Sequence, residues 1–428
     1  MTPVQEYGQR KRSSRALEEF DWHLLGVALV LTLIGLTFVW STTHTPTDGA
    51  GLVPRQLLYV GAVLPLVAVI VRFPYPIMAK LAAPAYLFII VLLLFLLVVS
   101  TDNVRGTRSW IRLPMGFSLQ PSEFAKVAVV LIVATYLRFR PKPSGLRDLV
   151  GPFALTLFPM LLVARQPDLG SALIMLPVLF AMLFCWGTPK RLLFTIFGCG
   201  LLLAVAIYFS PFLRDYQRSR INAFFESIPE QTDLAKRLRA EGNHPEAVRA
   251  ERRLRAMKQG SNFQVYHAMI SIGSGGPFGK GIGRGPHNRL DYLPERHNDF
   301  IFAVVGEEWG FVGSSIILGL FFLLVVIILG IARRTRDAFG RLICVGIATL
   351  FGFQVFLNTG VATGLLPVTG VTLPFMSSGG SSMLSSYIAL ALVLNVGAHR
   401  ITVLAGESFE QTVYGESAPF DRNRRRSS

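Results

Sequence analysis

Ten stretches of the chain are long and apolar enough to cross a bilayer as helices. A bilayer core about 30 Å thick needs roughly 20 apolar residues, so these stretches exclude an ordinary soluble domain. They lie at about 22–41, 54–72, 82–100, 122–138, 149–165, 169–187, 192–210, 300–332, 341–362 and 382–403. Only 16% of the residues are charged, against about 25% in soluble proteins. The sequence therefore predicts an all-α integral membrane protein with ten transmembrane helices.

The Lys and Arg residues predict how this bundle is oriented. Alternate short loops on one side carry twelve of them, and the opposite loops carry five. Because Lys and Arg concentrate in cytoplasmic loops, both termini are expected in the cytoplasm. The formal charge of +16 is thereby assigned to topology and not to nucleic acid. We expect basic cytoplasmic tails at 1–21 and 404–428, around a membrane domain at 22–403.

One predicted loop is far longer than the others. Residues 211–299 separate the seventh and eighth spans on the extracytoplasmic side, and a loop of this length is usually functional or has elements of its own. Its centre, 230–258, has the charge pattern of a solvated amphipathic helix, although binding of an anionic ligand stays open. A glycine-rich stretch at 273–283, which includes Lys280, could offer backbone N–H groups to phosphate.

Ionisable residues gather at the extracytoplasmic edge of the spans, where they are costly and therefore suggest function. Glu123 and Lys126 share one face of a helix start, so a plain ion pair is the alternative to a binding role. Asp168 and Asp299 each stand at a helix start, so capping is the alternative for both. His297 lies two residues before Asp299.

The last external connection, Gly364 to Ser382, is uncharged and broken by Pro and Gly. Such a stretch at membrane depth must line a cavity or be buried in protein. The three Cys lie in apolar runs and the His residues have no metal-ligand spacing, so neither a disulfide framework nor a zinc site is predicted.

At these motifs the chain resembles the SEDS family (shape, elongation, division and sporulation), which includes RodA, FtsW and SpoVE. The resemblance covers roughly 22–403 and rests on motifs at Gly106–Trp110, Gln120–Lys126, Gln166–Ser171, Ile272–Gly283, Leu293–Ala303 and Gly364–Ser382. It implies ten spans and polymerisation of lipid II into glycan strands. The family's essential loop aspartate falls on Asp299. Asn298 stands where the family usually has Thr, and Ser378 where it commonly has Tyr.

Within the family, Glu307–Phe311 and Gly279–Gly281 resemble RodA more than FtsW. The resemblance thus implies a peptidoglycan glycosyltransferase of cell-wall elongation in the bacterial cytoplasmic membrane, which makes β-1,4 glycan and releases undecaprenyl pyrophosphate. An FtsW-like septal polymerase, a lipid II flippase and a scaffold that recruits a transpeptidase are the alternatives.

Under this resemblance the candidate residues take definite roles. Asp299 is the expected general base, and Arg108 and Lys126 are the expected pyrophosphate clamps. Glu123 and Asp168 are candidate substrate-binding residues and ligands of a divalent cation, Mg or Mn. His297 and Lys280 are further candidates for substrate binding.

The expected partners are lipid II, a class B penicillin-binding protein and other elongation-machinery membrane proteins. Small residues allow a partner helix to approach closely. The ninth span, which carries Gly346 and Gly352 and follows Gly340, is the candidate interface with the transpeptidase. Packing of these glycines within the bundle itself is the alternative.

Overall fold

The computed structural model describes most of the predicted membrane domain. The described residues are 20–43, 52–99, 109–112, 118–143, 145–166, 168–209, 233, 236–238, 240, 261–289 and 297–399. The predicted tail at 404–428, and nearly all of the tail at 1–21 and of the 230–258 insertion, lie outside them.

Each predicted span coincides with one long helix of the described chain. These helices are α2 (Trp22–Thr42), α3 (Leu52–Arg72), α4 (Pro76–Val99), α5 (Pro121–Arg138), α6 (Leu146–Arg165), α7 (Leu169–Trp186), α8 (Lys190–Phe209), α14 (Ile301–Arg334), α15 (Ala338–Ala362) and α16 (Gly380–His399). Eight of them are long and apolar enough to cross a membrane, and α5 and α8 fall outside that set. The all-α membrane class is confirmed, while the count of ten crossings stays a prediction.

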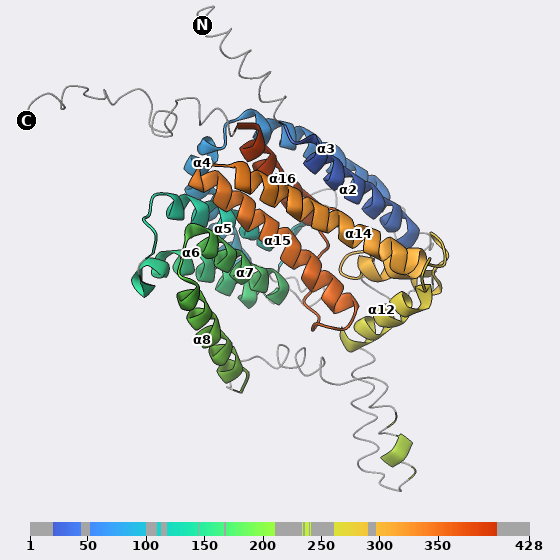
Figure 1. Cartoon of the computed structure of the whole chain (residues 1–428). Helices are drawn as coiled ribbons and strands as arrows, with labels where there is room; N and C mark the ends of the chain where they lie inside the picture. Colours follow the sequence, from blue (N-terminus) through green and yellow to red (C-terminus); the bar gives the residue numbers. More distant parts are fainter. Residues whose placement is uncertain are drawn as a thin grey trace, which may run out of the picture.

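Shorter elements lie between the long helices. They are the antiparallel pair β1 (Ile111–Arg112) and β2 (Ser118–Leu119) before α5, and α12 (Ser261–Gly275) and α13 (Pro286–Arg289) before α14. Residues 363–379 join α15 to α16 and are called the α15–α16 connection below. Figure 1 shows α12 beside the end of α14 that begins at Ile301.

Local chemistry accounts for several helix boundaries. Pro121 occupies the first turn of α5, where its missing N–H costs nothing. Asp168 caps α7 by accepting from the Ser171 N–H, and Asp337 caps α15 in the same way. Gly310 interrupts α14 with a φ of 66°, a conformation that favours glycine and kinks the helix.

Contacts between helix ends establish which ends lie together. Ser41, at the end of α2, donates to Glu308 near the start of α14, and Asn395, near the end of α16, donates to the carbonyl of Ile70 at the end of α3. Trp22 and His399, where the described bundle begins and ends, therefore lie at one end, which we call the basic end. Glu123, Asp168 and Asp299 lie at the other, which we call the site end.

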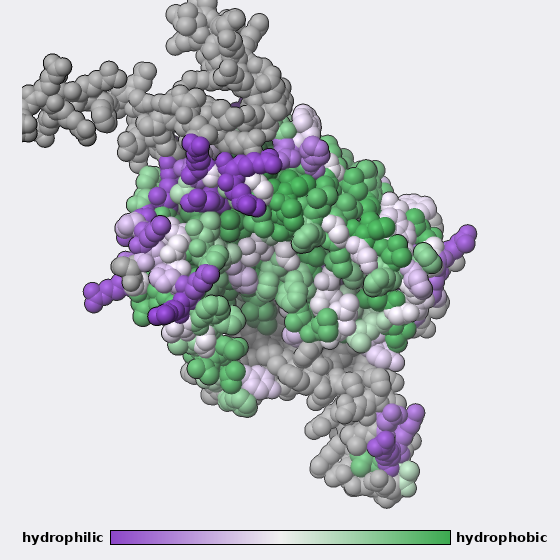
Figure 2. Space-filling view, viewed as in Figure 1, coloured by the Kyte–Doolittle hydropathy of each residue, from purple (hydrophilic) through white to green (hydrophobic). Residues whose placement is uncertain are grey.

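The basic end contains the predicted excess of cations. The α3–α4, α5–α6, α7–α8 and α14–α15 loops, which hold the twelve Lys and Arg, all lie there. Figure 2 shows hydrophilic side chains gathered at this end, next to a broad apolar surface. A multi-pass membrane protein accounts for both features.

The core is centred on the last two helices. Of the 18-residue apolar stretch that could span the membrane, 89% is buried in α16 and 17% in α3. The α16 helix is therefore central and α3 is peripheral. The α16 helix packs against α3, α5 and α15. The site end is consequently built around the start of α16 and the connection that leads into it.

Candidate active site

Two of the predicted motifs meet where the chain turns into α14. Residues 297–300, called the aspartate turn below, are hydrogen-bonded to the α15–α16 connection. The Ser378 N–H donates to the His297 carbonyl at 2.9 Å, and the Ser378 hydroxyl donates to Asn298 Oδ1 at 2.9 Å. The Ser377 hydroxyl donates to the Asn298 carbonyl at 2.8 Å. The two residues that depart from the family pattern, Asn298 and Ser378, are therefore bonded to each other.

Asp299 lies just before the helix that follows it. The α14 helix begins at Ile301, and its N-cap residue is Phe300, whose own side chain makes no capping hydrogen bond. The Asp299 side chain is partly exposed, and its Oδ2 lies 3.6 Å from where a Cβ on Gly370 would stand. Asp299 is therefore not the N-cap residue itself, and its carboxylate lies next to the connection. Capping by its side chain stays the alternative to a catalytic role.

Glu123 and Lys126 form a buried ion pair in the first turns of α5. Their residues are only 5% and 3% exposed, and Lys126 Nζ lies 2.8 Å from Glu123 Oε1. Glu123 Oε2 accepts from the Ser385 hydroxyl of α16 at 3.1 Å. The ion pair is therefore present, and burial makes each charge depend on the other. A binding role for the two residues stays a prediction.

Asp168 joins α7 to α5. Besides the Ser171 N–H at 3.1 Å, its carboxylate accepts from the Ser122 hydroxyl at 2.6 Å and from Gln120 Nε2 at 3.0 Å. The predicted cap is present, and the same group also holds the start of α5 against α7. Both oxygens of Asp168 are therefore engaged.

The α15–α16 connection also adjoins both of these carboxylate clusters. A Cβ on Gly170, two residues after Asp168, would collide with the Thr369 carbonyl, so glycine allows the connection to lie against α7. On the α5 side, Thr372 is hydrogen-bonded to Ser382 at 2.7 Å, one turn before Ser385. The connection therefore links the surroundings of all three predicted carboxylates.

A divalent cation does not fit Glu123 and Asp168 as they lie. A hard cation needs free oxygen ligands, whereas Lys126 and Ser385 occupy Glu123 and three donors occupy Asp168. In the described part of the chain, no group of three or more His, Cys, Asp and Glu residues could hold a metal ion. The Mg or Mn cation stays a prediction, and no step below depends on it.

Lys280 belongs to a second cluster, between the long loop and α14. Its Nζ lies 3.1 Å from Oε1 of the buried Glu307 and 2.6 Å from the Ser274 hydroxyl. The same Glu307 oxygen accepts from the backbone N–H of His287 at 3.2 Å. Nearby on α12, burial lowers the pKa of His267 below its ordinary value, and His287 adds to this effect. This cluster holds the glycine-rich stretch against α14.

The glycine-rich stretch uses its N–H groups within the protein. Gly279, Lys280 and Gly281 donate to the carbonyls of Gly275, Glu307 and Glu308. Gly283 donates to the Ser41 hydroxyl at 3.1 Å. A Cβ on Gly279 would collide with the Glu308 carbonyl, so these glycines permit backbone packing against α14. A phosphate cradle built from these N–H groups is therefore not supported.

Arg108 lies outside the described residues, but its neighbour Ser109 is described. The Ser109 hydroxyl donates to the Gln166 carbonyl at 2.6 Å, two residues before Asp168. The Gly106–Trp110 motif is therefore attached to the site end at Ser109. The clamp role of Arg108 stays a prediction.

Three buried residues near the site have roles that the sequence did not indicate. Glu307 and Glu308 are fully buried, whereas the sequence analysis considered them only as part of the RodA-like motif. Two adjacent acidic residues in an apolar span could have indicated a functional role, because such residues are costly there. Asn358 of α15 is also buried, and a single amide within an apolar helix gave no signal of its partners.

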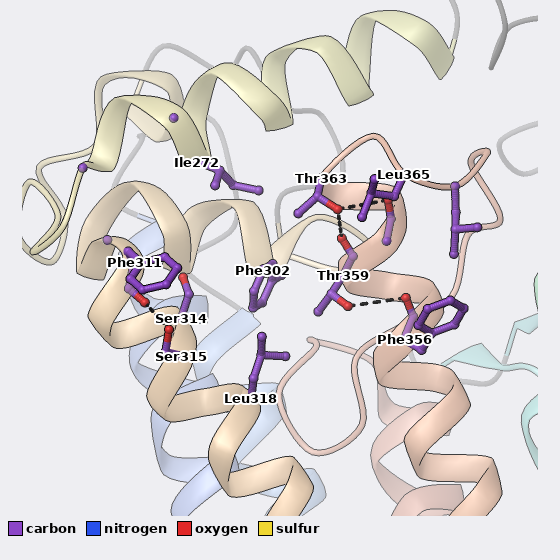
Figure 3. A pocket seen from close by; sticks show the side chains of 15 residues that line it. Ile272, Phe302, Phe311, Ser314, Ser315, Leu318, Phe356, Thr359, Thr363 and Leu365 are labelled. Atoms are coloured by element: carbon purple, nitrogen blue, oxygen red, sulfur yellow. Dashed lines mark hydrogen bonds between the residues drawn. The ribbon is translucent and has the colours of Figure 1, made fainter.

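A groove of about 590 Å³ opens between α12, α14 and α15. Figure 3 shows Ile272 of α12, Phe302, Phe311 and Leu318 of α14, and Phe356 of α15 around it. Ser and Thr side chains contribute hydroxyl groups, several of which donate to backbone carbonyls of their own helices. Phe302 lies three residues after Asp299, so the groove begins close to the aspartate turn.

Comparison with known proteins identifies the class and then the family. The fold and the site are those of a multi-pass membrane protein with a polar site at one end of its bundle. A family model described as "Cell cycle protein", for FtsW, RodA and SpoVE, matches residues 21–402. The chain therefore belongs to the SEDS family, in agreement with the resemblance at 22–403.

Several individual proteins are similar over most of the chain. The "Probable peptidoglycan glycosyltransferase FtsW" of Trichlorobacter lovleyi is 36% identical, over 89% of this chain and 94% of its own. The "Peptidoglycan glycosyltransferase MrdB" of Escherichia coli K12 is 34% identical over the same shares. The crystal structure of Thermus thermophilus RodA has a TM-score of 0.62 and 30% identity, covering 89% of this chain and 97% of that one.

A further solved structure concerns an assembly. It is entitled "Structural coordination of polymerization and crosslinking by a peptidoglycan synthase complex". One of its chains matches with a TM-score of 0.69 and 30% identity, over 89% of this chain and 98% of that one. Our chain is thus similar to a protein that works in such a complex.

Proposed function

We propose that the chain is a peptidoglycan glycosyltransferase that polymerises lipid II into β-1,4 glycan strands. The observation that carries the proposal is the position of Asp299, a partly exposed carboxylate just before the N-cap residue of α14, on a turn hydrogen-bonded to the α15–α16 connection. The names of the FtsW and MrdB relatives support the same activity.

In the proposed reaction, the 4-hydroxyl of the acceptor N-acetylglucosamine attacks the anomeric carbon of the donor N-acetylmuramic acid. The new C–O bond forms as the bond to undecaprenyl pyrophosphate breaks, and the α-linked donor becomes a β-1,4 glycan by inversion. Asp299 takes the hydroxyl proton as general base. The pyrophosphate leaves with the electron pair, so it needs positive charge nearby.

Arg108 and Lys126 are the proposed sources of that charge. Lys126 is enclosed and paired with Glu123, so it supports the site electrostatically from within the bundle. Arg108 is the proposed direct clamp, because a guanidinium binds two phosphate oxygens at once. His297 and Lys280 stay candidates for substrate binding, although Lys280 is engaged by Glu307.

We expect Arg108→Ala and Arg108→Lys both to slow polymerisation at limiting lipid II. A point charge does not replace a planar, bidentate clamp, so the Lys variant should recover little activity. Arg165→Lys, at an exposed position at the same end, is the matched control and should keep the wild-type rate. Full activity of both Arg108 variants would assign the pyrophosphate to other groups.

A polymerase and a flippase are separated by reconstitution in vesicles. Lipid II is supplied in the inner or the outer leaflet, and glycan and leaflet transfer are measured together. The proposal expects glycan from lipid II that faces the site end. Transfer between leaflets without polymer would favour the flippase.

The proposed partner is a class B penicillin-binding protein, whose single span would lie along α14 and α15. Phe311, Phe322 and Phe356 are exposed on this face, and a second groove of about 270 Å³ is bordered by Gly352. Of the three glycines that were predicted to lie at the interface, only Gly352 has room for a partner helix. A Cβ on Gly346 would meet Val130 and Met182, and one on Gly340 would meet Thr335 and Val396.

Cysteine crosslinking tests this interface. After replacement of Cys185, Cys199 and Cys344, we expect a cysteine at Thr349 or Phe356 to crosslink to the transpeptidase span. A cysteine at Leu161, which is 61% exposed on α6, is the control and should not. Crosslinks from Leu161 alone would contradict the α14–α15 face while leaving the partnership itself open.

Location and cellular role are also part of the proposal. We propose the bacterial cytoplasmic membrane, with the basic end and both termini in the cytoplasm, because basic loops favour that side. The identities to FtsW and MrdB, 36% and 34%, favour neither role. The elongation role therefore rests on the RodA-like motifs, with septal synthesis as its alternative.

A further inference from the structure

One buried amide joins the aspartate turn to the α15–α16 connection. Asn358 lies on α15 and is 1% exposed. Its Nδ2 donates to the Asp299 carbonyl at 2.8 Å and to the Val371 carbonyl at 2.7 Å. Both amide hydrogens are thus used on two segments that are distant in the sequence.

The orientation of this amide is determined by its partners. Both neighbours of Nδ2 are carbonyl oxygens, so exchanging the amide oxygen and nitrogen would place acceptor against acceptor. Asn358 Oδ1 is buried without a hydrogen-bond partner among the described residues. Among the described residues the side chain therefore donates two hydrogen bonds and accepts none, and the two donated bonds offset the cost of burying it.

The two bonds fix the surroundings of the Asp299 carboxylate. Val371 follows Gly370, whose φ of 69° turns the chain beneath Asp299. The Asp299 Oδ2 lies 3.6 Å from the Cβ position of Gly370. Asn358 therefore holds the backbone that carries the carboxylate and the backbone that faces it. On the N-terminal side, the bond between Asn298 and Ser378 restrains the same turn.

We propose that Asn358 is a positioning residue that fixes Asp299 for proton abstraction, with the Asn298–Ser378 bond as its weaker second restraint. This inference rests on the proposed function. Misplacing a reacting group by about 1 Å can cost about 10²-fold in rate. Asn358 holds Asp299 through the Asp299 backbone carbonyl, so it should affect turnover more than substrate binding.

Asn358→Leu tests the proposal because leucine keeps the volume and removes both donors. We expect kcat for lipid II polymerisation to fall about 10–10²-fold, with KM changed by less than about twofold. Asn395→Leu is the matched control. Asn395 is an equally buried amide that donates to the carbonyls of Ile70 and Phe73 at the basic end. It should lower the melting temperature but keep kcat within about twofold.

Ser378→Ala is a second variant, which tests the restraint of the aspartate turn if Asn358→Leu fails to fold. Ser378 is partly exposed, so its alanine variant should fold, and kcat should fall by a few-fold at unchanged KM. Equal effects of Asn358→Leu and Asn395→Leu on kcat, or an unchanged kcat in both Asn358→Leu and Ser378→Ala, would overturn the positioning role.

Wild type and Asp299→Asn are measured in parallel to separate the two claims. An inactive wild type or an active Asp299→Asn would contradict the proposed function itself. If those two behave as expected and the Asn358 and Asn395 variants do not differ in kcat, the positioning inference alone fails.

Discussion

Asp299→Asn should lower the rate of lipid II polymerisation about 10²–10⁴-fold, the usual loss when a general base is removed. Asparagine keeps the size of the side chain but cannot take the proton of the acceptor hydroxyl. Because Phe300 is the N-cap residue of α14, and asparagine accepts a hydrogen bond at a helix start about as well as aspartate does, the substitution should leave folding intact. Initial rates of lipid II consumption and a melting curve in detergent measure the two effects.

Asp168→Asn provides the structural comparison for this result. Asp168 does cap a helix and accepts three hydrogen bonds, so its variant should lose stability as well as activity. A folded Asp299→Asn protein that polymerises at near the wild-type rate would contradict the assignment of the base.

Lys126→Ala should destabilise the protein by about 3–5 kcal/mol, because it leaves the buried Glu123 carboxylate without its counter-ion. The pair is 2.8 Å apart and almost wholly enclosed. The sequence predicted Lys126 as a pyrophosphate clamp, and its burial implies that losing it also affects the fold. The melting temperature in detergent is the measurement.

A neutral double variant separates charge from packing. Lys126→Met combined with Glu123→Gln removes both charges at similar volume, so stability should largely return while polymerisation stays slow. Lys280→Ala is a milder comparison, since Lys280 is 27% exposed at the side chain and Glu307 keeps its contacts with His287. If Lys126→Ala melts like the wild type, the ion pair contributes little to the fold.

The helices could be predicted from the sequence because each has a length and composition that the bilayer imposes. Every predicted span matches a helix to within a few residues at most ends, from α2 through α16. The start of α14 was predicted one residue early, at 300, because Phe300 is apolar yet serves as the N-cap. The kink at Gly310 was not predicted, since it depends on the backbone of Gly279 packing against α14.

The site could be predicted only in part. Charged residues at the membrane boundary pointed to Glu123, Lys126 and Asp168, which form two polar clusters at the start of α5. Spacing could not reveal that Lys280 pairs with Glu307, or that Asn358 joins Asp299 to Val371. Those contacts depend on how distant segments pack, and a single sequence contains no direct record of that packing.

The central claim is most directly tested by product analysis with purified protein and lipid II in detergent. We expect a glycan that a muramidase cleaves to β-1,4-linked disaccharide units, with one undecaprenyl pyrophosphate released for each bond formed. Glycan and released pyrophosphate should both depend on Asp299. Intact lipid II after prolonged incubation with folded protein, or pyrophosphate release without glycan, would contradict the account.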